Sequence, residues 1–574
     1  MPSRSRRSFL KAVPTVVAAG VAAPAVTQPS RISTEVLESG EALTGVDFEP
    51  AESELMLNLV NANREHYEAI RRVNLSAETE PAFSFRPGRP AVNGEGAKAH
   101  SRAGTKWKPA RLAGARVSPR IEELAFESAA RLGQLIAARA VTSTALTQMY
   151  LDRLRKFDHR LECVITLTDT LALEQAAQAD ADVKAGRVRG PLHGVPYGIK
   201  DLFATTGIPT TWGAKPYEDQ VFDYDSTTVE RLRDAGAVLV AKLTTGELAI
   251  GDLWFGGRTR NPWNPETGSS GSSAGPAAAV AAGLVGFAIG TETGGSIISP
   301  ASTCGVTGLR PTYGRVSRHG VMTLRWTLDK VGPIARTIED CALALDAIAG
   351  PDGRDETVVD VPFAWTPAAR LEGLRIGYVA DEFDNPPVSA SADERARWPS
   401  RRALLEAARE AIGSTGATLQ PIELPDLPAQ SLYAILNAEA GAMFDDLVRS
   451  GGVRQLAGKG PNHRANQLRA ARYIPAVEYI RAQRIRTLLV ERMNALFTQV
   501  DAFLAPTSSA SVTMTNLTGH PAVVLKSGFV DGMPEAIMVT GRLFDEGTIL
   551  KIANAYERAT PWKDRHPELG STDM

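Results

Sequence analysis

The chain has 574 residues, a net charge of −2 and a hydrophobic fraction of 43%. This length is enough for one very large core or two ordinary ones, and the composition is that of a globular protein. No sustained basic stripe follows the extreme N-terminus, which argues against nucleic acid or an anionic membrane as the main partner. A small-molecule substrate is therefore expected.

The extreme N-terminus predicts an export signal over residues 1–25. The basic stretch "SRRSFLK" (5–11) precedes the apolar run "AVPTVVAAGVAAPAV", and Ala23 and Ala25 form an A-x-A exit. The run is shorter than the roughly 20 apolar residues that a spanning helix needs, so a cleaved signal peptide with no lasting membrane anchor is expected. The pair Arg6–Arg7 resembles the twin-arginine signal, which implies export to the periplasm or beyond. The alternative is a chance basic start on a cytosolic protein.

Residues 26–120 are predicted to be an N-terminal extension. Apolar residues recur with helical period over about 52–73, at Met56, Leu59, Val60, Tyr67 and Ile70. Residues 81–120 contain "RPGRP", "NGEG" and other breakers, which predict an irregular linker.

The main domain is predicted over 121–565, followed by a short tail over 566–574. Helical patterns over 121–140, 142–157 and 171–186 precede strand-like segments that alternate with helices. The strand-like segments are "GVPYGIKD", "AVLVAKL", "LRIGYVAD" and "DAFLAPT", and "STTVERLRDAG" is one of the helices. Short apolar strands separated by helices predict an α/β fold whose sheet is covered on both faces.

The three cysteines, Cys163, Cys304 and Cys341, are scattered without C-x-x-C spacing, which predicts buried thiols. The sequence also has no H-E-x-x-H or G-x-x-x-x-G-K-[ST] pattern, and its eight histidines are dispersed. No metal and no other cofactor is expected.

Three polar features lack a simple core explanation. Lys200 ends an apolar stretch, "TGSSGSSAGP" (267–276) opens an apolar helix, and "GTETGGSIISP" (290–300) presents Ser296 behind two glycines. Each has an ordinary interpretation, since lysines snorkel, Gly/Ser runs form linkers and a G-G-S turn caps a helix. Their order and spacing, however, closely resemble the amidase signature family, and the resemblance extends from about Leu124 to Trp562.

The resemblance implies a single-domain α/β/α sandwich around a large mixed, twisted β-sheet, and cleavage of carboxamides or, in some members, esters or carbamates. It implies an acyl-enzyme on Ser296, with Lys200 as base and Ser269 as proton relay after a cis bond at Gly268–Ser269. Ser270 matches a position that helps to hold the lysine. The backbone N–H groups implied for the oxyanion hole are those of Thr293, Gly294, Gly295 and Ser296.

Lysine chemistry supports these roles independently. A serine hydroxyl needs an adjacent base, and lysine is a base only when neutral. Its ordinary pKa of about 10.4 makes deprotonation at neutral pH cost roughly 4 kcal/mol, which burial can largely remove. Lys200 should therefore be buried away from carboxylates, and strand alternation should turn Asp201 to the opposite face.

Two departures from the family pattern matter. Glu292 stands where members commonly have Asp, so the carboxylate that braces the nucleophile loop could be re-aimed. Many members carry an arginine shortly after the nucleophile, whereas Ile297, Ile298 and Ser299 stand here. A neutral or apolar acyl group is therefore expected.

Several alternatives stay open. Ser273 in "GSSAG" formally fits an α/β-hydrolase nucleophile with His319 or His520 as base, although no strand is expected before it. A second alternative is the amidotransferase subunit that supplies ammonia to glutamyl-tRNA in the cytosol, and a third is an exported, non-catalytic solute-binding protein.

The substrate itself and the oligomeric state, with a homodimer as one candidate, are not determined by the sequence. Helices over 431–448 and near 471–484 are expected to cover the site. Phe444, Tyr473 and Ile474 are candidates for its lining, with ordinary core positions as the equal alternative.

Overall fold

The computed structural model describes residues 31–75, 79, 82–83 and 120–570. The predicted signal peptide and almost all of the predicted linker over 81–120 lie outside the described residues. None of the described helices is both long and apolar enough to span a membrane.

A single large mixed sheet organises the main domain. The described residues form an 11-stranded sheet in the order β1-β3-β2-β8-β10-β9-β14-β15-β13-β11-β12. Its strands are β1 (Val164–Leu167), β2 (Pro196–Lys200), β3 (Val238–Leu243), β8 (Phe287–Glu292), β9 (Thr307–Arg310), β10 (Lys330–Ala335), β11 (Arg375–Val379), β12 (Thr418–Ile422), β13 (Ala502–Pro506), β14 (Ala522–Val530) and β15 (Met533–Gly541). The four predicted strand segments correspond to β2, β3, β11 and β13, which confirms them.

Both parallel and antiparallel pairs occur in this sheet. β2 pairs in parallel with both β3 and β8, and β11 does so with β12 and β13. The remaining neighbours are antiparallel. Two short hairpins, β4 (Leu253–Trp254) with β5 (Gly257–Arg258) and β6 (Arg260–Asn261) with β7 (Asn264–Gly268), lie outside the sheet.

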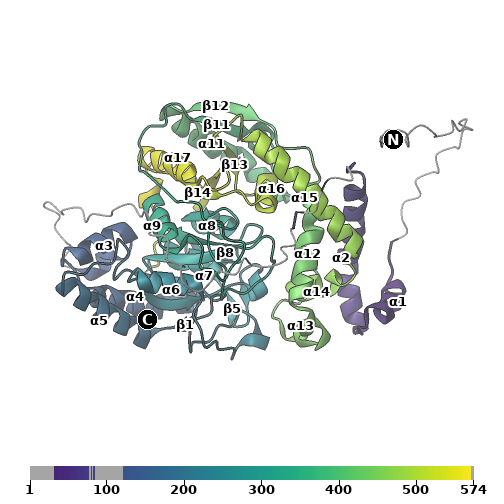
Figure 1. Ribbon diagram of the computed structural model, residues 1–574, viewed down its shortest axis with the longest axis horizontal. Helices are drawn as coiled ribbons and strands as arrows, with labels where there is room; N and C mark the ends of the chain where they lie inside the picture. The colour runs from purple at the N-terminus through teal and green to yellow at the C-terminus, as the bar shows by residue number, and fades with distance from the viewer. Residues whose placement is uncertain (1–30, 76–78, 80–81, 84–119, 571–574) are drawn as a thin grey trace, which may run out of the picture.

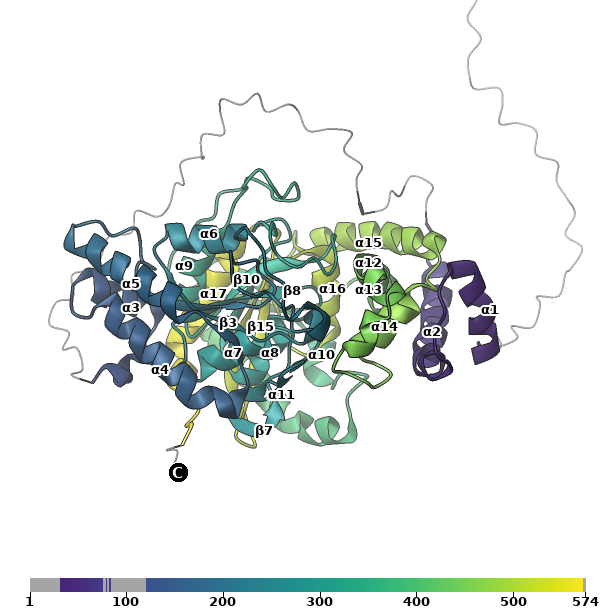
Figure 2. The same ribbon diagram turned by 90° about the horizontal axis from the view of Figure 1, so that it is seen from below.

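Helices cover both faces of the sheet (Figures 1 and 2). They are α3 (Ala129–Ala137), α4 (Ser143–Leu161), α5 (Asp169–Lys184), α6 (Thr227–Asp234), α7 (Ala274–Ala281), α8 (Ile298–Cys304), α9 (Ile338–Ile348), α10 (Ala380–Asp384), α11 (Ala392–Ser414), α12 (Tyr433–Met443), α13 (Asp445–Arg449), α14 (Arg464–Ala471), α15 (Ala476–Leu496), α16 (Ala510–Thr518) and α17 (Glu546–Ala559). Strand alternation divides the core: Tyr197 and Phe287 belong to one buried cluster with α3, α9 and α17, whereas Val238 and Ala288 belong to another with α7, α8 and α15. The predicted α/β/α sandwich is therefore confirmed.

Local sequence explains several helix ends. Thr142 caps α4, because its hydroxyl accepts a hydrogen bond from the Ala145 N–H. The helix predicted over 121–140 is instead split, because a 3₁₀ turn (Ile121–Leu124) ends before Ser128 caps α3. All three cysteines are free and buried, as predicted.

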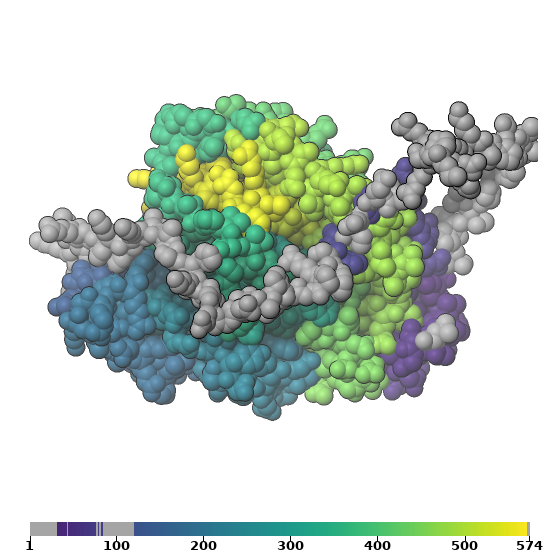
Figure 3. Space-filling model, viewed as in Figure 1, coloured from purple at the N-terminus to yellow at the C-terminus, as the bar shows by residue number. Residues whose placement is uncertain are grey.

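The N-terminal extension contributes two helices that pack on the main domain. α2 (Pro50–Arg71) confirms the helix predicted over 52–73, whereas α1 (Thr34–Thr44) was not predicted. α2 lies against α14, and Arg71 Nε donates to Glu478 Oε1 of α15 at 2.9 Å. In Figure 3 these purple helices lie against the green segment that contains α12 to α15. The two helices of the extension therefore pack on the outer side of the α12–α15 segment.

Candidate active site

Two parallel neighbours in the sheet position the candidate residues. β2 ends at Lys200 and β8 ends at Glu292, and because these strands are parallel their carboxyl ends meet at one edge. α7 precedes β8 and runs back along the sheet, so its first turn begins at the same edge. In α/β sheets this edge is the usual place for a ligand site.

Lys200 lies fully buried among three hydroxyl groups. Its Nζ is 2.8 Å from Ser272 Oγ, 3.2 Å from Ser273 Oγ and 2.9 Å from Thr291 Oγ1. Desolvation lowers the pKa of Lys200 well below its ordinary value, while the more distant Asp329 and Glu292 oppose this shift. The amine therefore lies in a setting that favours its neutral form.

The roles of these hydroxyls differ because Ser273 has already used its hydrogen. Ser273 Oγ donates to the Thr291 carbonyl at 3.1 Å and accepts from the Thr291 N–H at 3.2 Å. Since a hydroxyl has one hydrogen, Ser273 is an acceptor toward Lys200. For Ser272, in contrast, no described residue other than Lys200 lies within hydrogen-bond distance of the hydroxyl, so its hydrogen is not committed to a carbonyl.

Asp201 does not neutralise this lysine. It lies on the opposite face, as strand alternation predicts, and binds Lys242 Nζ at 2.8 Å through Oδ1. Its Oδ2 accepts from the N–H and the hydroxyl of Thr211. The carboxylate is thus committed elsewhere.

The sequence prediction chose the wrong serine pair next to Lys200. The cis peptide bond lies at Gly271–Ser272 and not at Gly268–Ser269. The Ser269 hydroxyl donates to the Ser270 carbonyl at 3.0 Å, and the Ser270 N–H donates to Asp252 Oδ2. Ser272 and Ser273 are therefore the residues next to Lys200, where the sequence prediction expected Ser269 and Ser270.

The physical reason for this correction is the start of α7. The segment "TGSSGSSAGP" contains two Ser-Ser pairs, and only the second abuts the helix, which begins at Ala274. The first pair follows the β6–β7 hairpin. The direct junction between a serine pair and the apolar helix is the sequence signal that identifies the second pair.

The loop that carries Ser296 is tied to this serine pair. The Ser273 N–H donates to the Ser296 carbonyl at 3.1 Å. Gly295 has φ +127°, a conformation that favours glycine, and nothing in the described part of the chain accepts the N–H groups of Gly294, Gly295 and Ser296. These three residues line the cavity, and their N–H groups are three of the four oxyanion-hole donors that the sequence resemblance implies, the fourth being the N–H of Thr293.

Two buried carboxylates hold the ends of the loop. Glu292 Oε2 accepts from the N–H groups of Ile297 and Ile298 at 2.7 and 2.8 Å, and its Oε1 binds Arg310 at 2.8 Å. Burial alone would raise the pKa of Glu292, but Arg310 and the loop N–H groups outweigh it and lower the pKa. Asp329 Oδ1 accepts from the Thr293 hydroxyl at 2.6 Å. Glu292 therefore braces the loop despite its extra methylene.

Ser296 lines a cavity of about 370 Å³, a volume within the usual range of small-molecule sites. The cavity is lined by Leu59, Ala62, Asn63, His66, Ala249, Ile250, Gly251, Gly271, Gly294, Gly295, Ser296, Ser299, Arg325, Tyr433, Leu436, Asn437, Arg464 and Gln467. α2 of the N-terminal extension and α12 thus form part of its wall.

The three side chains proposed from sequence as lining are absent from this cavity. Phe444 is buried in the core beside Trp212, Ile474 packs on the core, and Tyr473 packs on the cluster under α1 and α2. Their ordinary core interpretation is the correct one. α12 does cover the site, but through Tyr433, Leu436 and Asn437.

The histidine-based alternative has no support in the geometry. Ser273 is fully buried and bonded as described, and His520 Nδ1 lies 2.7 Å from Thr518 Oγ1. Burial lowers the pKa of His520 to about 3. His319 lies beside the Tyr224 ring. In the described part of the chain neither imidazole bonds to a serine of this site.

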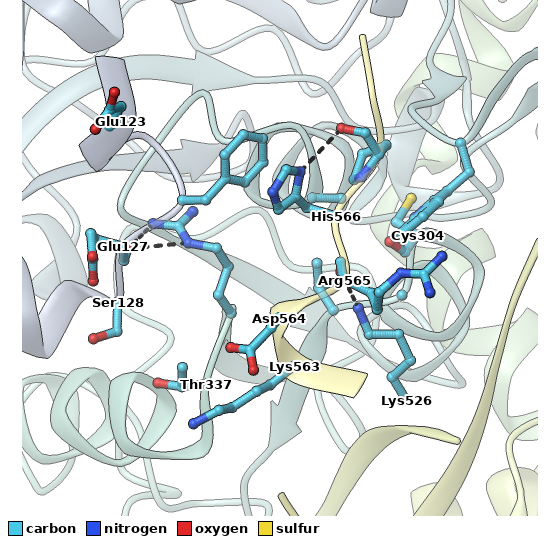
Figure 4. A pocket seen from close by; sticks show the side chains of 17 residues that line it. Glu123, Glu127, Ser128, Cys304, Thr337, Lys526, Lys563, Asp564, Arg565 and His566 are labelled. Atoms are coloured by element: carbon cyan, nitrogen blue, oxygen red, sulfur yellow. Dashed lines mark hydrogen bonds between the residues drawn. The ribbon is translucent and has the colours of Figure 1, made fainter. Parts of the chain in front are cut away.

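A separate cavity of about 340 Å³ lies away from these residues (Figure 4). Its wall includes Glu127, Lys526 and His566, and it shares no lining residue with the cavity at Ser296. Lys526 donates to the Arg565 carbonyl, and Arg336 donates to the Glu127 carbonyl, so these cations are already engaged. This cavity is not part of the candidate site.

The chain belongs to the amidase family, whose sequence model, described as Amidase, matches residues 145–515. It is therefore an amidase-family hydrolase with the fold that the sequence resemblance implied. The match includes Lys200, both serine pairs and Ser296.

Known proteins are similar over most of this chain. The glutamyl-tRNA(Gln) amidotransferase A-subunit of Roseiflexus sp. (strain RS-1) is 37% identical over 479 residues, which cover 75% of this chain and 95% of that protein. The native peptide amidase from Stenotrophomonas maltophilia has a TM-score of 0.68 and 31% identity, and covers 79% of this chain and 100% of its own. The Thermotoga maritima glutamyl-tRNA(Gln) amidotransferase A-subunit has a TM-score of 0.65 and 26% identity, and covers 80% of this chain and 100% of its own.

Proposed function

We propose that this protein hydrolyses a carboxamide C–N bond of a small substrate through an acyl-enzyme on Ser296. The observation that carries the proposal is the fully buried Lys200, surrounded by three hydroxyls and by no carboxylate within ion-pair distance in the described part of the chain. A neutral amine in this position can accept a proton, which a serine nucleophile must lose.

The proton path follows from hydrogen-bond counting. A neutral amine has two hydrogens and one lone pair, and Ser273 and Thr291 take the two hydrogens as acceptors. The lone pair then accepts the Ser272 hydrogen, and Ser272 takes the proton of Ser296 as Ser296 Oγ attacks the carbonyl carbon. The same path returns the proton to the leaving nitrogen when the C–N bond breaks. Water completes the cycle by attacking the acyl-enzyme.

The loop N–H groups act on the charge that develops during attack. The N–H groups of Gly294, Gly295 and Ser296, which have no acceptor among the described residues, can donate to the carbonyl oxygen as it becomes an oxyanion, and Thr293 is a further candidate. Glu292 and Asp329 keep these donors in place, so little reorganisation is needed during the reaction.

A second candidate function is that of a glutamyl-tRNA(Gln) amidotransferase A-subunit. The identity of 37% over 95% of such a relative favours it. The feature that argues for an independent hydrolase is α2, which lines the cavity and comes from an N-terminal extension. Ammonia release from glutamine by the isolated chain, compared with hydrolysis of aryl and alkyl amides, distinguishes the two functions. The predicted export signal adds another distinction, because a protein that acts on tRNA has to remain in the cytosol.

The proposal is tested by a hydrolysis screen of primary, alkyl and aryl amides, carbamates and esters. Ser296→Ala should abolish turnover, and Ser269→Ala is the matched control because its hydroxyl is bonded to the Ser270 carbonyl. Turnover that survives in Ser296→Ala, or that is lost equally in Ser269→Ala, would contradict the proposed nucleophile. Tight ligand binding with no turnover of any substrate would instead favour a solute-binding protein.

A further inference from the structure

Two buried arginines line the cavity beside Ser296. Arg325 lies in the loop before β10, and Arg464 is the first residue of α14; they are 7% and 2% exposed. A guanidinium carries its charge at neutral pH, and burial of a charge without an ionic partner is unfavourable. Such residues need an explanation that core packing does not give.

The hydrogen bonds of Arg325 and Arg464 to described residues involve only some of the nitrogens of each guanidinium. Arg325 Nε donates to the Leu436 carbonyl at 2.6 Å, and no described residue accepts from its two terminal nitrogens. Arg464 donates to Gln467 Oε1 at 2.9 Å and to the Ala249 carbonyl at 3.2 Å, while its buried Nε has no partner in the part of the chain that the structure describes. Within the described ranges, neither arginine has a carboxylate within 4.0 Å.

The nearest acids are committed to other donors. Asp329 Oδ2 accepts from the N–H groups of Leu324 and Arg325, and its Oδ1 accepts from Thr293. Glu247 accepts from two backbone N–H groups, those of Ala457 and Gly458.

The third acid, Glu439, accepts from the N–H and the hydroxyl of Thr327 and from Tyr479. The positive charge of the two arginines is therefore not neutralised by an ion pair, although it faces the cavity that contains the candidate nucleophile.

We propose that Arg325 and Arg464 bind a carboxylate group of the substrate, so that this site selects amides that carry a negative charge. The inference rests on the proposed function and specifies its substrate class. Two guanidinium groups provide forked donors that match the geometry of a carboxylate, and a ligand that pairs with them removes the cost of the unpaired charges. Burial lowers the pKa of Arg464 to about 9, which leaves it charged at neutral pH.

This proposal adds a negative charge on the substrate, which the sequence-based expectation of a neutral or apolar acyl group did not include. That expectation considered only the three positions after Ser296. Ile297 and Ile298 are fully buried, so side chains there do not face the cavity. The structure instead brings arginines from 29 and 168 positions further along the chain (325 − 296 and 464 − 296) to the same cavity.

The test compares anionic amides with a neutral amide of similar size. The anionic probes are N-(4-nitrophenyl)succinamic acid and 4-acetamidobenzoate, which carry the carboxylate on opposite sides of the amide, and the neutral probe is 4-nitrobutyranilide. One anionic probe should have a kcat/KM roughly ten- to a hundred-fold above that of the neutral probe, as expected for charge-assisted hydrogen bonds. Arg325→Met and Arg464→Met should raise KM for the preferred anionic probe much more than for the neutral probe, so that the preference for the anionic probe is lost.

The control variant is Arg449→Met, which removes an exposed charge from the neighbouring α13. Arg325→Lys should restore part of the preference in a folded protein, so a destabilised methionine variant does not decide the result. The proposal is overturned if kcat/KM is equal for all three probes. It is also overturned if kcat/KM falls by the same factor for the neutral and anionic probes in both arginine variants.

A binding measurement tests the carboxylate site independently of the proposed catalytic mechanism. In Ser296→Ala, calorimetry should show an anionic probe binding at least ten-fold more tightly than the neutral probe, whatever the catalytic mechanism. Equal affinities would overturn the carboxylate site, whereas turnover that survives in Ser296→Ala would overturn the nucleophile alone.

Discussion

Two fully buried lysines on neighbouring strands have opposite surroundings. Lys242 on β3 pairs with Asp201 Oδ1 at 2.8 Å and donates to Thr210 Oγ1 at the same distance. Lys200 on β2 has only three hydroxyls within hydrogen-bond distance in the described part of the chain. Desolvation lowers the pKa of both, but Asp201 opposes it at Lys242, whereas only more distant acids oppose it at Lys200.

This comparison shows how one sheet provides both a structural cation and a base. Burial alone does not make a lysine reactive, because a paired carboxylate stabilises its charged form. The absence of such a partner among the described residues is what allows Lys200 to be neutral. The two lysines therefore predict opposite consequences for stability and activity when each is replaced.

The largest expected effect is on activity in Lys200→Met. Loss of the base should lower kcat/KM by about 10⁴-fold, the upper range for general-base catalysis. The unfolded chain binds a proton at Lys200 up to pH about 10.4 and the folded chain only up to a lower pH, so the wild-type lysine destabilises the fold at neutral pH. Thermal unfolding should thus show a variant at least as stable as wild type, and a destabilised but active variant would contradict the account.

Ser272→Ala should have the next largest effect, a fall in kcat/KM of about 10³-fold, because it removes the hydroxyl that links the base to the nucleophile. The measurement is steady-state amide hydrolysis beside Ser269→Ala, which should retain activity close to wild type. A larger loss in Ser269→Ala than in Ser272→Ala would restore the assignment made from sequence.

Lys242→Met should act mainly on stability. It leaves Asp201 buried without its ionic partner, which typically costs about 3–5 kcal/mol in the free energy of unfolding. Denaturant titration measures this loss. A matched Lys200→Met titration serves as the control, and the comparison fails if both variants lose the same stability.

The smallest expected effect is a change in the shape of the pH profile. Protonated Lys200 cannot accept a proton, so kcat/KM should fall as pH falls through its lowered pKa. The acidic limb of the pH profile, where kcat/KM falls, should lie at a pH well below the ordinary lysine pKa of about 10.4. The same limb should remain in Lys242→Met. A limb at the ordinary lysine pKa would mean that Lys200 is solvated in solution.

The sequence predicted the strands and the position of the candidate site better than it predicted the contacts within that site. The apolar run before Lys200 and the glycines before Ser296 are local signals, and the structure places Lys200 at the end of β2 and the glycine loop directly after β8. The choice between Ser269 and Ser272 depends on which of the two Ser-Ser pairs adjoins the start of α7, a signal that the sequence prediction did not use. Arg325 and Arg464 were missed because their meeting beside Ser296 is set by tertiary packing.

The most direct test of the central claim is the rate at which a fluorophosphonate labels the protein, with the labelled residue identified by peptide mass spectrometry. The account predicts label on Ser296, with the rate nearly abolished in Lys200→Met and Ser272→Ala and unchanged in Ser269→Ala. Label on another serine, or an unchanged labelling rate in Lys200→Met, would contradict the claim that a neutral buried lysine activates Ser296.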